Sequence, residues 1–121
     1  MNKSKDVLIL DDDPDIVEAL ALILEDAGYT TRKLHMVETL DILQDDLPGV
    51  IFLDIWMSGI DGRDICRHLK SQPATRHIPI ILISANTNIQ WIAKEVGADD
   101  YVAKPFDLEE VVAKVRKYLA L

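Results

Sequence analysis

The sequence predicts an α/β protein in which helices cover both faces of a five-stranded parallel sheet, a doubly wound (βα)5 arrangement. Short apolar runs alternate along the chain with longer stretches of helical period. These runs are continuously apolar, which is typical of strands that are buried on both faces of a parallel sheet. Strict alternation of strand and helix favours right-handed crossovers, with helices on both faces. Because 121 residues suit one domain, we expect a single domain over residues 1–121.

Five segments are expected to form the strands. Three are strongly apolar and two are weaker, and the weaker pair is expected at the outside of the sheet. The strong strands are residues 7–10, 50–53 and 78–83, and the weaker ones are residues 29–34 and 100–103. In open parallel sheets, ligands bind beyond the carboxyl ends of the strands. The residues that directly follow each run are therefore the candidates for function.

Five helices are expected between and after these strands, over residues 14–27, 37–46, 62–71, 88–96 and 108–119. The first, fourth and fifth carry clear apolar stripes, and the other two are weaker. Asp13 suits the N-cap of the first helix, and Gly28 and Gly97 suit the ends of the first and fourth. Asp107 with Glu110 resembles a capping box at the start of the last helix.

Composition excludes several classes of function. The net charge of −8, from 13 Lys+Arg and 21 Asp+Glu, argues against direct binding of nucleic acid or an anionic membrane. A lone cysteine, Cys66, excludes an intrachain disulfide and a cysteine-rich zinc site. No apolar run approaches the roughly 18–20 residues of a membrane span, and the N-terminus does not resemble a signal peptide. We expect a cytoplasmic protein.

Polar and charged side chains gather where the predicted strands end. They are Asp11, Asp12 and Asp13 after the first strand, Asp54 after the third, Ser84 after the fourth and Lys104 after the fifth. Parallel strands bring these positions to one edge of the sheet. Two carboxylates about 4 Å apart repel by roughly 4 kcal/mol at an effective dielectric constant near 20. A divalent cation bound by these oxygen atoms would offset that repulsion, and the positive charge of Lys104 would reduce it further.

These residues resemble the receiver domain of two-component response regulators, the CheY-like family, over residues 7–119. The match comprises the acid pair Asp11 and Asp12, the acceptor Asp54, the turn Gly59–Gly62, the hydroxyl Ser84, the aromatic Tyr101 and the Lys104-Pro105-Phe106 end. Ser84 follows Asp54 by 30 residues and precedes Lys104 by 20, as in the family. The resemblance implies a flavodoxin-like sheet with strand order 2-1-3-4-5.

The resemblance implies that Asp54 accepts a phosphoryl group from a phosphohistidine. The partner upstream is then a sensor histidine kinase or a phosphotransfer protein. Mg²⁺ is expected on Asp54, on Asp12 directly, on Asp11 through water, and on the backbone carbonyl of Trp56. Lys104 and Ser84 are expected to contact phosphoryl oxygens during transfer, which is mostly positioning and charge stabilisation. Such a domain catalyses its own phosphorylation and slow dephosphorylation, and is not a conventional enzyme.

The output step is expected to be a conformational switch. Ser84 moves toward the phosphoryl group, and Tyr101 turns into the vacated space. This alters the face formed by the fourth helix, the fifth strand and the fifth helix. Trp91 lies opposite the apolar stripe of the fourth helix, so Trp91 and Tyr101 are candidate contacts for a partner. That partner is a downstream protein, a fused output domain, or a second copy in a phosphorylation-dependent dimer.

Two positions depart from the family pattern. Ser58 stands where the family often has proline, so this loop loses a fixed φ angle. Trp56 is unusually bulky beside the expected site. Its indole either shields the acyl phosphate from water or packs over the loop, and the sequence leaves both interpretations open.

Two other functions fit parts of the pattern. A small Mg²⁺-dependent phosphatase of the haloacid-dehalogenase-like class uses an Asp-x-Asp motif after its first strand, and Asp11-Asp12-Asp13 has that spacing. Against it, 121 residues leave little room for a substrate-capping domain. A flavin-binding electron carrier shares the topology, but three aspartates after the first strand would repel the FMN phosphate.

Overall fold

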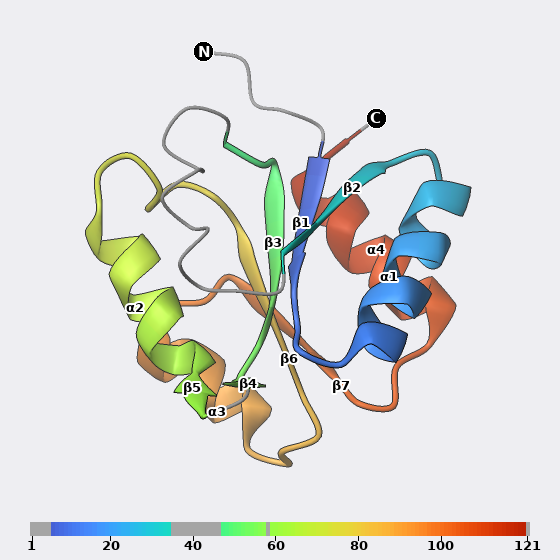
Figure 1. Ribbon diagram of the computed structural model, residues 1–121. Coiled ribbons are helices and arrows are strands. Elements are labelled where there is room, and N and C mark those ends of the chain that lie inside the picture. Colours follow the sequence, from blue (N-terminus) through green and yellow to red (C-terminus); the bar gives the residue numbers. More distant parts are fainter. Residues whose placement is uncertain (1–5, 35–46, 58, 121) are drawn as a thin grey trace.

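The computed structural model describes residues 6–34, 47–57 and 59–120, and its central element is one five-stranded sheet. All neighbouring strands are parallel, in the order β2-β1-β3-β6-β7 (Figure 1). The strands are β1 (Asp6–Leu10), β2 (Thr30–Leu34), β3 (Val50–Asp54), β6 (Ile80–Ser84) and β7 (Asp100–Ala103). If the five strands of this sheet are numbered 1 to 5 along the chain, their order is 2-1-3-4-5, as predicted. The predicted fold class is therefore confirmed.

Two pairs of helices cover the two faces of the sheet (Figure 1). On one face, α1 (Pro14–Asp26) and α4 (Leu108–Tyr118) pack on a cluster that includes Phe52 of β3. On the other, α2 (Gly62–Ser71) and α3 (Ile89–Val96) pack on a cluster that includes Leu53 and Leu82. Successive residues of a strand point to opposite faces, so a continuously apolar strand supplies both clusters at once.

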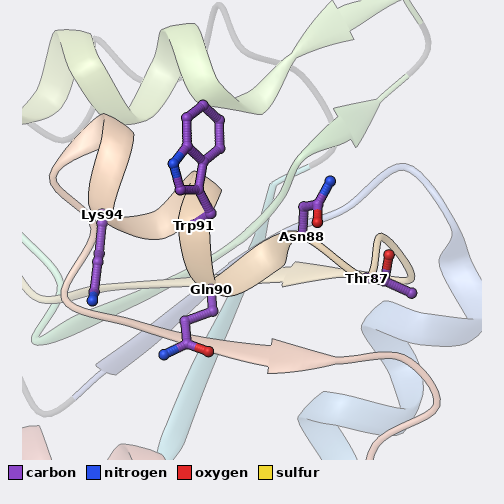
Figure 2. Close-up of a pocket in the computed structure, with 5 residues that line it drawn as sticks. All are labelled: Thr87, Asn88, Gln90, Trp91 and Lys94. Carbon is purple, nitrogen blue, oxygen red and sulfur yellow. The ribbon is translucent and has the colours of Figure 1, made fainter.

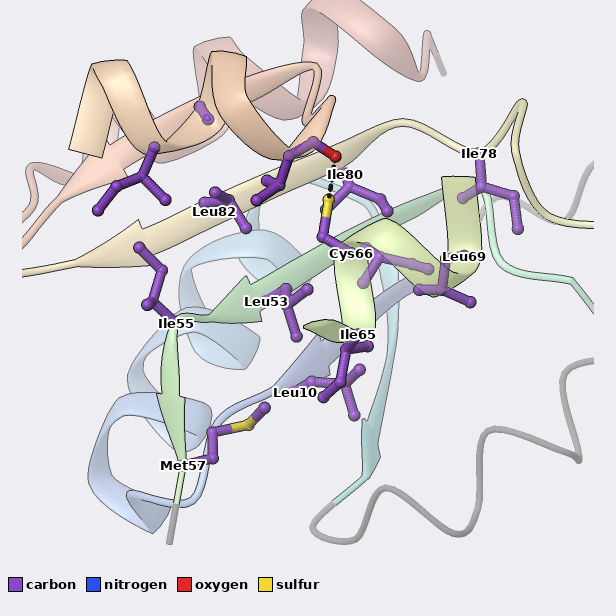
Figure 3. Close-up of a cluster of buried hydrophobic side chains, with 14 of the residues drawn as sticks. Leu10, Leu53, Ile55, Met57, Ile65, Cys66, Leu69, Ile78, Ile80 and Leu82 are labelled. Carbon is purple, nitrogen blue, oxygen red and sulfur yellow. Dashed lines mark hydrogen bonds between the residues drawn. The ribbon is translucent and has the colours of Figure 1, made fainter. Parts of the chain in front are cut away.

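The cluster under α2 and α3 contains the cysteine of the chain (Figure 3). The Cys66 thiol is buried and donates to the carbonyl oxygen of Val96 at 3.6 Å. Burial raises the pKa of Cys66 to about 11. The thiol therefore stays protonated near neutral pH and acts as a packing residue that links α2 to the end of α3.

Most predicted helix ends agree with the structure, and one cap does not. Asp13 accepts a hydrogen bond from the backbone N–H of Asp15 at 2.9 Å, as expected of an N-cap. Gly97 ends α3 in the left-handed conformation, with φ of 79°. The predicted capping box at Asp107 and Glu110 is wrong, because the Asp107 side chain makes no cap hydrogen bond. The Asp107 carboxylate is exposed, so water competes with it for the backbone N–H groups of the first turn of α4.

Other departures are local. The strand predicted over residues 78–83 begins at Ile80, since Pro79 has no N–H to donate to a ladder. A small antiparallel hairpin, β4 (Trp56–Met57) with β5 (Ile60–Asp61), follows β3 and was not predicted. The predicted helix over residues 37–46 and the departure at Ser58 lie outside the described residues. Among the helices that the structure does describe, none has both the length and the apolar character to span a membrane.

Candidate functional site

The carboxyl ends of β1 and β3 bring two aspartates to the same level of the sheet. Leu10 pairs with Leu53 in the parallel ladder, so Asp11 and Asp54 come next on adjacent strands. Both are buried, with 1% of Asp11 and 6% of Asp54 exposed, whereas Asp12 is exposed. The Asp11 side chain is held by the backbone N–H of Asp13 at 2.9 Å. The start of α1 therefore fixes the orientation of a buried carboxylate.

Lys104 lies between the two buried carboxylates. Its Nζ atom is 3.3 Å from Oδ2 of Asp11 and 3.6 Å from Oδ1 of Asp54. The residue follows β7 directly, and its backbone N–H donates to the carbonyl oxygen of Ser84 at 2.9 Å. Because one lysine faces two carboxylates, Asp11, Asp54 and Lys104 together carry one negative charge when both carboxylates are ionised.

The surroundings of Asp54 destabilise its ionised form. Burial and the neighbouring charge of Asp11 raise the pKa of Asp54 to about 6, although Lys104 and a backbone hydrogen bond from Trp56 act in the opposite direction. One oxygen atom from each of Asp11, Asp12 and Asp54 lies within 4.8 Å of the others. Three carboxylate oxygens at such spacing are the hard donor set that a small divalent cation prefers.

Ser84 is the last residue of β6 and lies beside the site. Asp54 pairs with Ile83 in the ladder, so Ser84 is one position beyond Asp54 on the adjacent strand. Its Oγ atom accepts a hydrogen bond from the backbone N–H of Asn86 at 3.0 Å. The hydroxyl keeps its own proton for donation to another acceptor.

Tyr101 lies on β7, and its ring is partly buried against the cluster under α2 and α3. Tyr101 pairs with Leu82 in the ladder, two residues before Ser84. The two residues expected to switch are therefore on adjacent strands and close to the same edge. Their motion remains a prediction.

The two tryptophans are both exposed. Trp91 is 63% exposed on α3, as the apolar stripe of that helix predicts, and the indole of Trp56 on β4 is 64% exposed. Figure 2 shows Trp91 and Gln90 leaving α3 on different sides, within a surface pocket that Thr87, Asn88 and Lys94 complete. The role of the Trp56 carbonyl as a ligand and that of Trp91 as a partner contact remain predictions.

Gly62 supports the site in a way that sequence reasoning missed. A Cβ atom at this position would lie 2.1 Å from the carbonyl oxygen of Asp54, and the Gly62 backbone N–H donates to the carbonyl of Ile55. Only glycine allows the start of α2 to approach β3 this closely. The turn that contains it was matched to the family, but nothing local in the sequence indicates the contact.

Comparison with known proteins agrees with this geometry. The sequence pattern of the response regulator receiver domain matches residues 7–116. Response regulator MprA of Mycobacterium avium is 36% identical over 116 residues, covering 93% of this chain and 50% of the relative. The DNA-binding dual master transcriptional regulator RpaA of a Synechocystis species is 35% identical, covering 93% and 48%. The chain thus spans about half the length of these curated relatives.

Solved structures give the same result. The signal receiver domain of a signal transduction histidine kinase from Syntrophus aciditrophicus is similar with a TM-score of 0.86 and 33% identity, covering 97% of this chain and 91% of that one. Fold, sequence pattern and the acidic edge of the sheet agree, and the chain belongs to the response regulator receiver domain family, the phosphorylatable switches of two-component signalling.

Proposed function

We propose that Asp54 is the phosphoryl acceptor of this receiver domain. The observation that carries the proposal is the place of Asp54 at the end of β3, where Nζ of Lys104 is 3.6 Å from its Oδ1 atom and Ser84 is one position beyond it on the adjacent strand. The donor is the phosphohistidine of a sensor histidine kinase or of a phosphotransfer protein. The P–N bond of the donor breaks as a P–O bond to the Asp54 carboxylate forms, and the imidazole leaves with the electron pair.

The neighbouring side chains stabilise the charge that develops on the transferred group. Lys104 supplies a positive charge on the side of Asp54 that faces Asp11. Ser84, one position beyond the residue paired with Asp54, donates its hydroxyl proton to a phosphoryl oxygen. Both effects act mainly through position and charge, which is what phosphoryl transfer requires. Later attack of water on the acyl phosphate returns Asp54 to a free carboxylate.

The acidic cluster fits Mg²⁺, and its carboxylates are the proposed ligands. Asp11, Asp12 and Asp54 provide oxygens within 4.8 Å of one another, and the carbonyl of Trp56 is the proposed fourth protein ligand. Asp12, which is exposed, is the proposed direct ligand, and Asp11, which is buried, is the proposed ligand through water. When bound, the ion neutralises negative charge between the carboxylates and the incoming phosphoryl group.

The output is a change at the face formed by α3, β7 and α4. Ser84 moves toward the phosphoryl group, Tyr101 turns inward, and Trp91 and Tyr101 contact a partner in the cytoplasm. Relatives that are about twice as long as this chain support a fused or separate output domain as that partner. A second phosphorylated copy is an alternative partner. The domain itself has a net charge of −8 and is not expected to bind nucleic acid or membranes directly.

The test is incorporation of phosphate from ³²P-labelled acetyl phosphate with Mg²⁺. We expect label on the wild type, no label on Asp54→Asn, and loss of incorporation when EDTA removes the metal. Asp13→Asn is the matched control, because Asp13 belongs to the same triplet but caps α1. Label that persists on Asp54→Asn and disappears on Asp11→Asn would instead favour a phosphatase with its nucleophile after β1.

A further inference from the structure

Lys114 of α4 contacts the aromatic residue that is expected to switch. Its Nζ atom lies 5.1 Å from the centre of the Tyr101 ring, within the range of a cation–π interaction. The same atom is 2.6 Å from Oδ1 of Asp100. Lys114 is partly buried, with 26% of its side chain exposed.

Asp100 ties this lysine to the backbone of the same strand. The Asp100 side chain is 8% exposed, and its Oδ1 atom accepts from both Lys114 and the backbone N–H of Tyr101 at 2.9 Å. The interactions form a closed circuit from the Tyr101 backbone to Asp100, then to Lys114, and back to the Tyr101 ring. Two of these three interactions do not depend on where the ring points, whereas the cation–π interaction does.

Lys117 provides an internal comparison one turn further along α4. Its Nζ atom is 3.5 Å from Oδ2 of the same Asp100, so the two lysines share an acidic partner. Its aromatic neighbour is Tyr118, at 5.3 Å, rather than Tyr101. Tyr118 in turn places its hydroxyl 3.0 Å from Oδ2 of Asp100. Removing either lysine costs Asp100 one cation, but only Lys114 touches the switching ring.

We propose that Lys114 is a latch that holds Tyr101 in its present orientation and opposes its turn into the protein. The inference rests on the proposed function, because it assumes that Tyr101 turns when Asp54 is phosphorylated. In this proposal the turn carries the ring away from Lys114, whose ammonium group is held by Asp100. The resting state therefore has an attraction that the switched state lacks, which biases the equilibrium toward rest by about two- to fivefold.

The experiment is a titration with beryllofluoride in the presence of Mg²⁺, which mimics a phosphoryl group on Asp54. NMR resonances of the Tyr101 ring, assigned with Tyr101→Phe, report the switch. Lys114→Met keeps the length of the side chain and removes its charge. We expect this variant to reach half-saturation at a concentration about two- to fivefold lower than wild type. Lys114→Arg, which retains a cation, is expected to restore the wild-type midpoint.

Two further variants separate a latch from a general loss of charge. Lys117→Met is expected to titrate like wild type. In a Tyr101→Leu background, where the backbone amide resonance of Ser84 reports the titration, Lys114→Met is expected to cause no shift. An equal shift in Lys117→Met, or a shift that persists without the Tyr101 ring, overturns the latch. So does an unshifted Lys114→Met when the wild type switches normally. If the wild type itself does not bind beryllofluoride, the proposed function fails, and the latch fails with it.

Discussion

At the carboxyl end of the sheet one lysine faces two buried carboxylates, whereas at the amino end Lys70 faces one exposed carboxylate, that of Asp99. Lys70, from the end of α2, places Nζ 2.7 Å from Oδ2 of Asp99, just before β7. It also donates to the carbonyl oxygens of Arg76 and Ile78, at 3.1 and 2.9 Å. Oδ2 of Asp99 accepts in addition from the backbone N–H of Ile80 at 2.8 Å.

The two ends of the sheet use charged residues differently: those at the amino end stabilise the fold, and those at the carboxyl end form the candidate site. At the amino end all three protons of the Lys70 ammonium group have an acceptor and the charges are matched, so the arrangement stabilises the fold. At the carboxyl end the ionised carboxylates of Asp11 and Asp54 exceed the charge of Lys104 by one negative charge. That excess costs stability and leaves the site ready for a cation and a phosphoryl group. Functional sites often retain strain of this kind.

The largest effect is expected from loss of the lysine at the carboxyl end. Lys104→Met removes the cation that contacts Asp54, and we expect phosphorylation by acetyl phosphate to slow by about a hundredfold, as for loss of one positioned charge-stabilising donor. The measurement is the initial rate of ³²P incorporation at saturating Mg²⁺. Lys94→Met, which alters an exposed lysine on α3, is the control. A Lys104→Met rate within threefold of wild type would remove Lys104 from the proposed mechanism.

The core strands and the candidate site could be predicted from the sequence, whereas several local contacts could not. The core strands were predictable because continuous apolar runs fit few structures other than buried parallel strands, and the site followed because Asp11, Asp54 and Lys104 come at strand ends. The hairpin of β4 and β5 was not predictable, since two-residue strands carry no periodic signal. Contacts such as that of Lys114 with Asp100 depend on the packing of a helix against a strand, which no local pattern records.

The next effect in size is expected at the amino end. Lys70→Met leaves the exposed Asp99 carboxylate and two carbonyl groups without their ammonium donor, so we expect the free energy of unfolding to fall by about 1.5 kcal/mol. Urea titration followed by circular dichroism measures this change. Phosphorylation of the folded variant is expected to match wild type, because the substitution lies at the opposite end of the sheet. A Lys70→Met variant as stable as wild type would show that the pair is not a stabilising clamp.

The smallest expected effect has the opposite sign. Asp54→Asn removes one of the mutually repelling carboxylates while keeping the shape of the side chain, so without Mg²⁺ we expect the free energy of unfolding to rise by about 1 kcal/mol. Asp100→Asn is the matched control, since hydrogen bonds from Lys114, Tyr118 and the Tyr101 backbone outweigh burial and lower the pKa of Asp100. The ionised Asp100 stabilises the fold at neutral pH, and its loss is expected to be destabilising.

Adding Mg²⁺ sharpens this last prediction. We expect the ion to stabilise wild type by binding the native state and to bind Asp54→Asn more weakly, so the advantage of the variant is expected to shrink or reverse. The Asp100→Asn difference is expected to stay unchanged, because Asp100 lies apart from the acidic cluster. Urea midpoints with and without Mg²⁺ give both quantities. If Asp54→Asn and Asp100→Asn destabilise the protein equally and Mg²⁺ alters neither difference, the carboxyl end of the sheet is no more strained than the rest of the molecule.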